Sequence, residues 1–152
     1  MHVEERNIVE REVRIAAAPA TVFEFFTEPD KMIQWKGRKA ELDPRPGGIY
    51  RVDINDQAVA RGEYVELDPP HRVVFTWGWE GGGGEHAVPP GSSRVEVTLE
   101  PDGEGTLVRL RHLDLPDAAL EIHGQGWDLF LGRLAKAAVG EDPGPVPAPE
   151  SD

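Results

Sequence analysis

The sequence predicts an α+β domain in which a curved antiparallel sheet of about seven strands surrounds one long C-terminal helix. Only the segment 123–139 keeps apolar residues at helical spacing over a long stretch, with Trp127, Leu131 and Leu134 on one face. Most of the remaining chain alternates apolar and polar residues, which is typical of strands with one solvated face. A single apolar helix face is buried by packing on a sheet, so we expect the strands to wrap around this helix.

The chain is expected to begin with one strand and two short helices. Apolar and polar residues alternate from 7 to 15, which predicts the strand. Pro19 is expected in the first turn of a helix, where its missing N–H has no partner to lose. Pro29 ends that helix and begins a second short one, which carries Trp35.

Six further strands are expected before the long helix, because turn residues separate short alternating segments. These segments are 38–42, 49–54, 58–67, 73–79, 95–99 and 108–112. Their short connections predict antiparallel neighbours. Asp117 is expected to cap the long helix at its N-terminus, and Gly140, followed by Pro143, is expected to end it.

Composition limits the classes of function. The chain has 152 residues, which fits one domain over 1–140 and a disordered, Pro-rich acidic tail over 141–152. It has no Cys, which excludes disulfides and thiol chemistry. The net charge of −12 disfavours nucleic-acid partners, and Lys36, Arg38 and Lys39 are expected in a solvated loop. No run of about 18 apolar residues predicts a membrane span, and the charged N-terminal segment is unlike a signal peptide, so a cytoplasmic location is expected.

Five segments resemble a known family in the same order along nearly the whole chain. They are IAAAPATVFEFFTEPDKMIQW at 15–35, RPGGIYRV at 45–52, GEYVELDPPHRVVFTW at 62–77, SSRVEVTLEPDGEGTLVRLRH at 92–112 and HGQGWDLFLGRL at 123–134. In them the chain resembles the START-like (helix-grip, SRPBCC) superfamily, and within it the polyketide cyclase-like branch of homologues of the heat-shock ATPase activator's C-terminal domain. The resemblance implies a cavity between the sheet and the last helix. Many members bind small molecules, a few catalyse cyclisation or dehydration, and co-chaperone activity belongs to members with an additional N-terminal domain.

Aromatic and apolar side chains on the helix and on the strands that face it are the candidate ligand-binding residues. They are Trp35, Tyr50, Tyr64, Phe75, Trp77, Val97, Leu110, His112, Trp127, Phe130 and Leu131. Aromatic walls with a few polar tips are typical of small-molecule sites. We therefore expect binding of a small hydrophobic or aromatic molecule, without a cofactor. The alternative interpretation is that the same side chains fill a packed core.

His112 is the most interesting titratable residue, because it falls on the apolar side of its strand. With a Tyr hydroxyl it could serve as the acid and base of a cyclase, dehydratase or hydrolase. The favoured interpretation is a buried neutral histidine, bonded to a neighbour such as the Trp127 indole. His112 and His123 are too few to hold a metal ion, so no metal is expected. Ser93 has no evident base beside it.

The glycine-rich segment 78–86 is not expected to bind phosphate, because no GK[ST] follows it and Glu80 and Glu85 would repel an anion. A mobile hairpin loop is expected over 80–91, and it could act as a lid on the cavity. A third hypothesis is an interaction module that binds a chaperone or a second copy through the acidic surface or the tail. The free chain is expected to be a monomer or a homodimer.

Overall fold

The computed structural model describes residues 8–55, 58–80 and 88–144, and it has the predicted α+β architecture. Its elements are β1 (Val9–Ile15), α1 (Pro19–Thr27), α2 (Pro29–Trp35), β2 (Lys39–Leu42), β3 (Ile49–Asn55), β4 (Ala58–Asp68), β5 (Arg72–Trp77), β6 (Ser93–Asp102), β7 (Gly105–Leu113), the 3₁₀ turn η1 (Asp117–Ala119) and α3 (Leu120–Ala137). The strands form one seven-stranded sheet in the order β1-β7-β6-β5-β4-β3-β2, and every neighbouring pair is antiparallel. Residues 81–87 of the expected lid 80–91 and residues 145–152 of the expected tail 141–152 lie outside the described residues.

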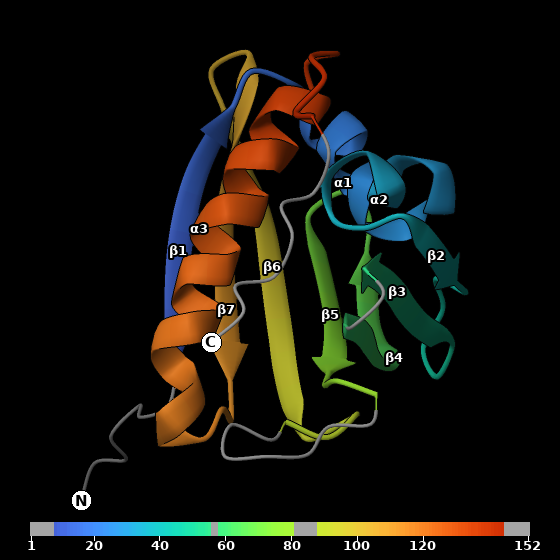
Figure 1. The fold of residues 1–152 in the computed structure, drawn as a ribbon. Helices are drawn as coiled ribbons and strands as arrows, with labels where there is room; N and C mark the ends of the chain where they lie inside the picture. The colour runs from blue at the N-terminus through green and yellow to red at the C-terminus, as the bar shows by residue number, and fades with distance from the viewer. Residues whose placement is uncertain (1–7, 56–57, 81–87, 145–152) are drawn as a thin grey trace, which may run out of the picture.

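The three helices lie on the same side of the sheet (Figure 1). Helix α3 runs along β1, β7 and β6, while α1 and α2 lie together at one end, beside β2 (Figure 1). This arrangement confirms the predicted sheet around a C-terminal helix. No helix within the described ranges is both long and apolar enough to span a membrane.

The ends of two elements differ from the prediction. Asp117 does not cap the long helix, because it lies inside η1, and α3 begins only at Leu120 without a side-chain cap. Strand β5 ends at Trp77, and Trp79 instead pairs with Ala60 in an isolated antiparallel bridge. The pairing still keeps the Trp77 and Trp79 rings together, with centroids 5.2 Å apart.

The core lies between the concave side of the sheet and the helices. The predicted stripe of α3 is buried there at Trp127, Leu131 and Leu134, while Phe130 is half-buried at its edge. The stripe ends where predicted, at Gly140, whose φ of +86° is readily adopted by glycine. Burial of these side chains fixes α3 across the sheet and determines which of its residues face the strands.

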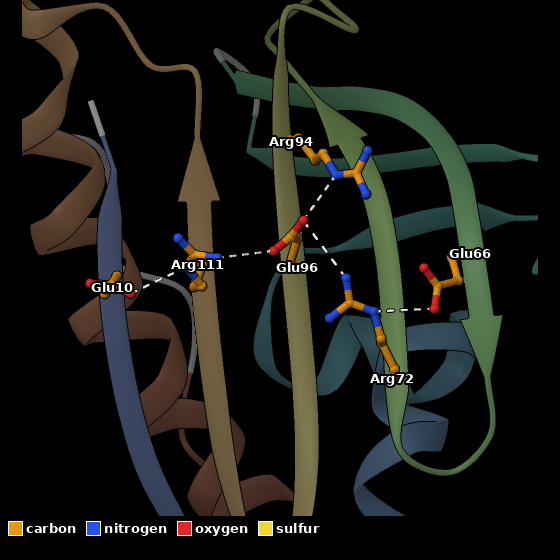
Figure 2. Close-up of polar contacts among 6 residues, drawn as sticks. All are labelled: Glu10, Glu66, Arg72, Arg94, Glu96 and Arg111. Atoms are coloured by element: carbon orange, nitrogen blue, oxygen red, sulfur yellow. Dashed lines mark hydrogen bonds and ion pairs between the residues drawn. The ribbon is translucent and has the colours of Figure 1, made fainter. Parts of the chain in front are cut away.

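The opposite face of the sheet is a polar surface on which charges of opposite sign alternate from strand to strand. Figure 2 shows the network, which consists of Glu10 on β1, Arg111 on β7, Glu96 and Arg94 on β6, Arg72 on β5 and Glu66 on β4. Glu96 lies at its centre, with Arg94 at 3.2 Å and Arg111 at 3.6 Å. This network leaves one face of the sheet in contact with solvent, and the large buried apolar side chains lie on the face that the helices cover.

Candidate functional site

A cavity of about 340 Å³ lies between α3 and the strands that face it. Its lining residues are Lys36, Ala58, Trp77, Trp79, Ile122, His123, Gly126, Trp127 and Phe130. Lys36 and His123 are the two titratable members of this lining, and the rest is apolar. The volume lies at the lower end of the roughly 300–1,000 Å³ that is usual for small-molecule sites.

Lys36 enters the cavity wall from the C-terminal end of α2. Its backbone N–H donates to the carbonyl of Met32 at 3.0 Å and closes the last turn of the helix. The preceding residue, Trp35, is bonded on both sides: its Nε1 donates to the Phe25 carbonyl at 2.9 Å, and its carbonyl accepts from Arg133 Nε at 2.8 Å. These contacts hold α2 against α1 and α3, and they direct the Lys36 side chain inward.

Four aromatic rings surround the Lys36 ammonium. Its Nζ lies 3.9 Å from the ring centroid of Trp127 and 4.2 Å from that of Trp77, with Phe130 at 4.8 Å and Trp35 at 5.7 Å. Lys36 is only 1% exposed, and this burial lowers the pKa of its amine well below the ordinary 10.5. The prediction that Lys36 lies in a solvated loop is therefore wrong, because the rings of three separate elements close around it.

The neighbouring basic residues do lie at the surface. Arg38 is exposed and pairs with Asp53 at 3.1 Å, and Lys39 is also exposed. The cluster of basic residues in the sequence thus divides after Lys36, at Gly37. A Cβ at Gly37 would lie 2.6 Å from the Asp53 carbonyl oxygen, so glycine permits the close approach of α2 to β3.

His112 is completely buried behind the cavity wall in a chain of hydrogen bonds. The Trp127 indole Nε1 donates to His112 Nδ1 at 2.9 Å, so the ring proton is on Nε2. That Nε2 donates to Ser93 Oγ at 2.8 Å, and Ser93 Oγ donates to the Trp77 carbonyl at 2.8 Å. Burial, with smaller contributions from the charges of His123 and Lys36, lowers the pKa of His112 to about 2.

His112 lies beside Ser93, so the expectation that Ser93 has no base next to it is wrong. The pair nevertheless does not activate Ser93 as a nucleophile. A catalytic base must accept the proton of the hydroxyl group. His112 instead donates to Ser93, and its other nitrogen already accepts from Trp127. Both ring nitrogens are used in holding the core and the Trp127 indole in place.

A second histidine fixes another indole of the wall. His123 Nδ1 donates to the Ala119 carbonyl at 2.8 Å, and its Nε2 accepts from Trp79 Nε1 at 3.0 Å. The Trp77 indole Nε1, in contrast, is buried without a hydrogen-bond partner. Trp79 and Trp127 are thus oriented by hydrogen bonds, whereas Trp77 between them retains an unused donor.

The candidate residues from the sequence fall into two groups. Trp77, Trp127 and Phe130 line the cavity. The others are buried outside its lining: Trp35, Tyr50, Tyr64, Phe75, Val97, Leu110, His112 and Leu131. The candidates from the sequence did not include the rest of the lining, namely Lys36, Ala58, Trp79, Ile122, His123 and Gly126.

Neither tyrosine reaches the cavity. Tyr64 donates its hydroxyl to the Phe26 carbonyl at 2.7 Å, and Tyr50 stacks on Phe75 with ring centroids 4.1 Å apart. Burial raises the pKa of both phenols, so both stay protonated. Across the described ranges, no three His, Asp or Glu side chains come together as a metal site.

A family model and a solved structure both relate this chain to AHSA1-like proteins. The model of the family described as "Activator of Hsp90 ATPase homolog 1-like protein" matches residues 16–138. The solution structure of an AHSA1-like protein from Rhizobium etli is 44% identical over 95% of this chain and 89% of that one, with a TM-score of 0.71. No curated protein matches the sequence.

Two further solved structures are 26% identical to this chain over the aligned residues. CalU16 from Micromonospora echinospora is 26% identical over 88% of this chain and 76% of that one, with a TM-score of 0.69. DynU16, a protein of the dynemicin biosynthetic locus, is 26% identical over 90% of this chain, with a TM-score of 0.76. The chain spans only 49% of DynU16.

Proposed function

Because the chain belongs to the family of Activator of Hsp90 ATPase homolog 1-like proteins, with their START-like helix-grip fold, we propose that it binds a small aromatic or hydrophobic molecule in the cavity beside α3. The observation that carries the proposal is the aromatic wall formed by Trp77, Trp79, Trp127 and Phe130. A flat ring that stacks on such a wall gains about 0.5–1.5 kcal/mol beyond the burial of its apolar area.

The hydrogen bonds behind the wall favour binding to a preformed site. His112 and His123 hold the indoles of Trp127 and Trp79 in one orientation each. A ligand then has fewer side chains to order when it binds, which lowers the entropic cost of association. In this proposal the two histidines position the aromatic wall for the ligand.

The enzyme hypothesis with His112 and a tyrosine as acid and base has less support. His112 is fully buried with both ring nitrogens bonded, and neither Tyr50 nor Tyr64 is part of the cavity lining. A general acid or base must come within hydrogen-bond reach of the reacting group, directly or through one water. The arrangement therefore favours binding over catalysis by these residues.

Gly126 offers a direct test, because it lines the cavity and a Cβ there would meet nothing within 4 Å. The substitution Gly126→Leu would place an isobutyl group at the cavity wall. Gly132 on the same helix is exposed, lies outside the lining and also has open space at its Cβ, so Gly132→Leu is the matched control. Both variants should fold, which circular dichroism and thermal unfolding would verify.

The probe is N-phenyl-1-naphthylamine, an uncharged aromatic dye whose fluorescence rises in apolar surroundings. We expect saturable binding to the unmodified chain and to Gly132→Leu, and at least a ten-fold weaker affinity for Gly126→Leu. If the dye does not bind, or if it binds Gly126→Leu as well as the control, the cavity is not its site and the proposal is wrong.

A further inference from the structure

The Lys36 side chain combines a buried charge with access to the cavity. Its Nζ lies among aromatic rings, and no carboxylate within the described residues pairs with it. Lysine is almost never fully buried unless its charge is paired. Lys36 therefore departs from the usual rule in the wall of a cavity that can admit another molecule.

The aromatic rings compensate this charge only in part. Cation–π contacts with Trp127 and Trp77 favour the ammonium form. Burial nevertheless lowers the pKa of the amine, because the charged form loses its water. An anion at Nζ would supply the compensation that the folded chain lacks.

A second donor without an acceptor belongs to a residue of the same cavity wall. The Trp77 indole Nε1 is buried without an acceptor, and Lys36 Nζ lies 4.2 Å from the centroid of that ring. Most buried donors in proteins are satisfied, so an unsatisfied one next to a cavity calls for an explanation. The ammonium of Lys36 lacks an acceptor in the described part of the chain and belongs to the cavity lining, so it fits a ligand that brings an oxygen anion.

Resting on the proposed function, we propose that the ligand is an aromatic acid, and that Lys36 binds its carboxylate as the counter-ion. The aromatic part lies against Trp77, Trp79 and Trp127, and the acid group points to Nζ. The other titratable residue of the lining, His123, is already bonded through both ring nitrogens, so the charge selection falls to Lys36.

The test compares a matched acid and amide in the same cavity. Naphthalene-2-carboxylate and naphthalene-2-carboxamide have nearly the same shape and differ in charge. Each is titrated by displacement of N-phenyl-1-naphthylamine from the unmodified chain, from Lys36→Met and from Lys39→Met. Methionine replaces the lysine stem with a neutral chain of similar length, and Lys39 is the exposed control.

We expect the acid to bind the unmodified chain and Lys39→Met about ten-fold more tightly than the amide, because a hydrogen bond to a charged group is worth more than a neutral one. In Lys36→Met the preference should disappear, while the amide keeps its affinity. Equal affinities in the unmodified chain, or a preference that survives in Lys36→Met, would overturn the inference and leave the proposed function intact. Binding of the dye without displacement by either compound would also overturn it, whereas failure of the dye to bind would end both proposals.

Discussion

The burial of Lys36 predicts an unusual dependence of stability on pH, which the substitution Lys36→Met should remove. In the unfolded chain the amine has the ordinary pKa of 10.5, and in the folded protein burial lowers it. Between the two values the unfolded chain holds the additional proton, so the free energy of unfolding rises with pH. Below the folded-state pKa both states are protonated, and the full penalty of burying the charge is present.

The magnitude follows from the same linkage. Each pH unit by which the folded-state pKa lies below 10.5 destabilises the protonated folded protein by about 1.4 kcal/mol. In a domain of this size, 1 kcal/mol changes the melting temperature by about 2–4 °C. A methionine brings a flexible apolar side chain to the space among the rings and has no charge to desolvate. We therefore expect Lys36→Met to melt several degrees higher than the unmodified chain near neutral pH.

The assay is thermal unfolding of the unmodified chain, Lys36→Met and Lys39→Met at intervals from pH 6 to pH 10.5. The advantage of Lys36→Met should shrink as the pH approaches 10.5, and Lys39→Met should follow the unmodified chain throughout. Tyr50 and Tyr64 also have shifted pKa values, but they are common to all three proteins and cancel in the comparison. An advantage that stays constant with pH, or a less stable Lys36→Met at every pH, would refute the reasoning.

Three further predictions concern the supporting structure. Ser93→Ala leaves the buried His112 Nε2–H without an acceptor, so urea unfolding should show a loss of about 1–3 kcal/mol, and a loss below about 0.5 kcal/mol would contradict the bond. Because burial lowers the pKa of His112 to about 2, its ring should stay neutral with the proton on Nε2 from pH 8 to pH 4 in ¹⁵N NMR spectra; protonation in that range would contradict this. Gly126→Ala should stabilise α3 by about 0.5–1 kcal/mol, whereas Gly124→Ala should gain less, because a Cβ there would lie 2.6 Å from Arg11 Nη2; equal gains in thermal unfolding would argue against this contact.

Local signals in the sequence were sufficient for the architecture. Pro19 and Pro29 start α1 and α2 because proline suits the first helical turn, and the alternating segments form strands because one of their faces is buried. Asp117 does not cap α3, because capping depends on where the first helical turn closes, and α3 begins three residues later at Leu120.

The site was less predictable, because it depends on contacts between distant segments. Nothing in the sequence around Lys36 distinguishes it from its exposed neighbour Arg38, and only the packing of α2 against α3 buries one and leaves the other in water. Trp79 carried a usable signal, since it follows Trp77 at the strand spacing of two. Which aromatic side chains line the cavity and which lie behind it is determined by the curvature of the sheet, which periodicity does not encode.

The polar network on the outer face of the sheet influences the order in which the strands pair. Apart from Arg94, which pairs with Glu96 on the same strand, its charges are negative, positive, negative, positive and negative across β1, β7, β6, β5 and β4, at Glu10, Arg111, Glu96, Arg72 and Glu66 (Figure 2). Each exposed pair contributes little stability by itself. Exchanging two neighbouring strands, however, would place like charges side by side, which is unfavourable across a sheet. The charges on the solvated face thus favour the observed order of the strands, and they pair β1, the first strand of the chain, with β7, the last.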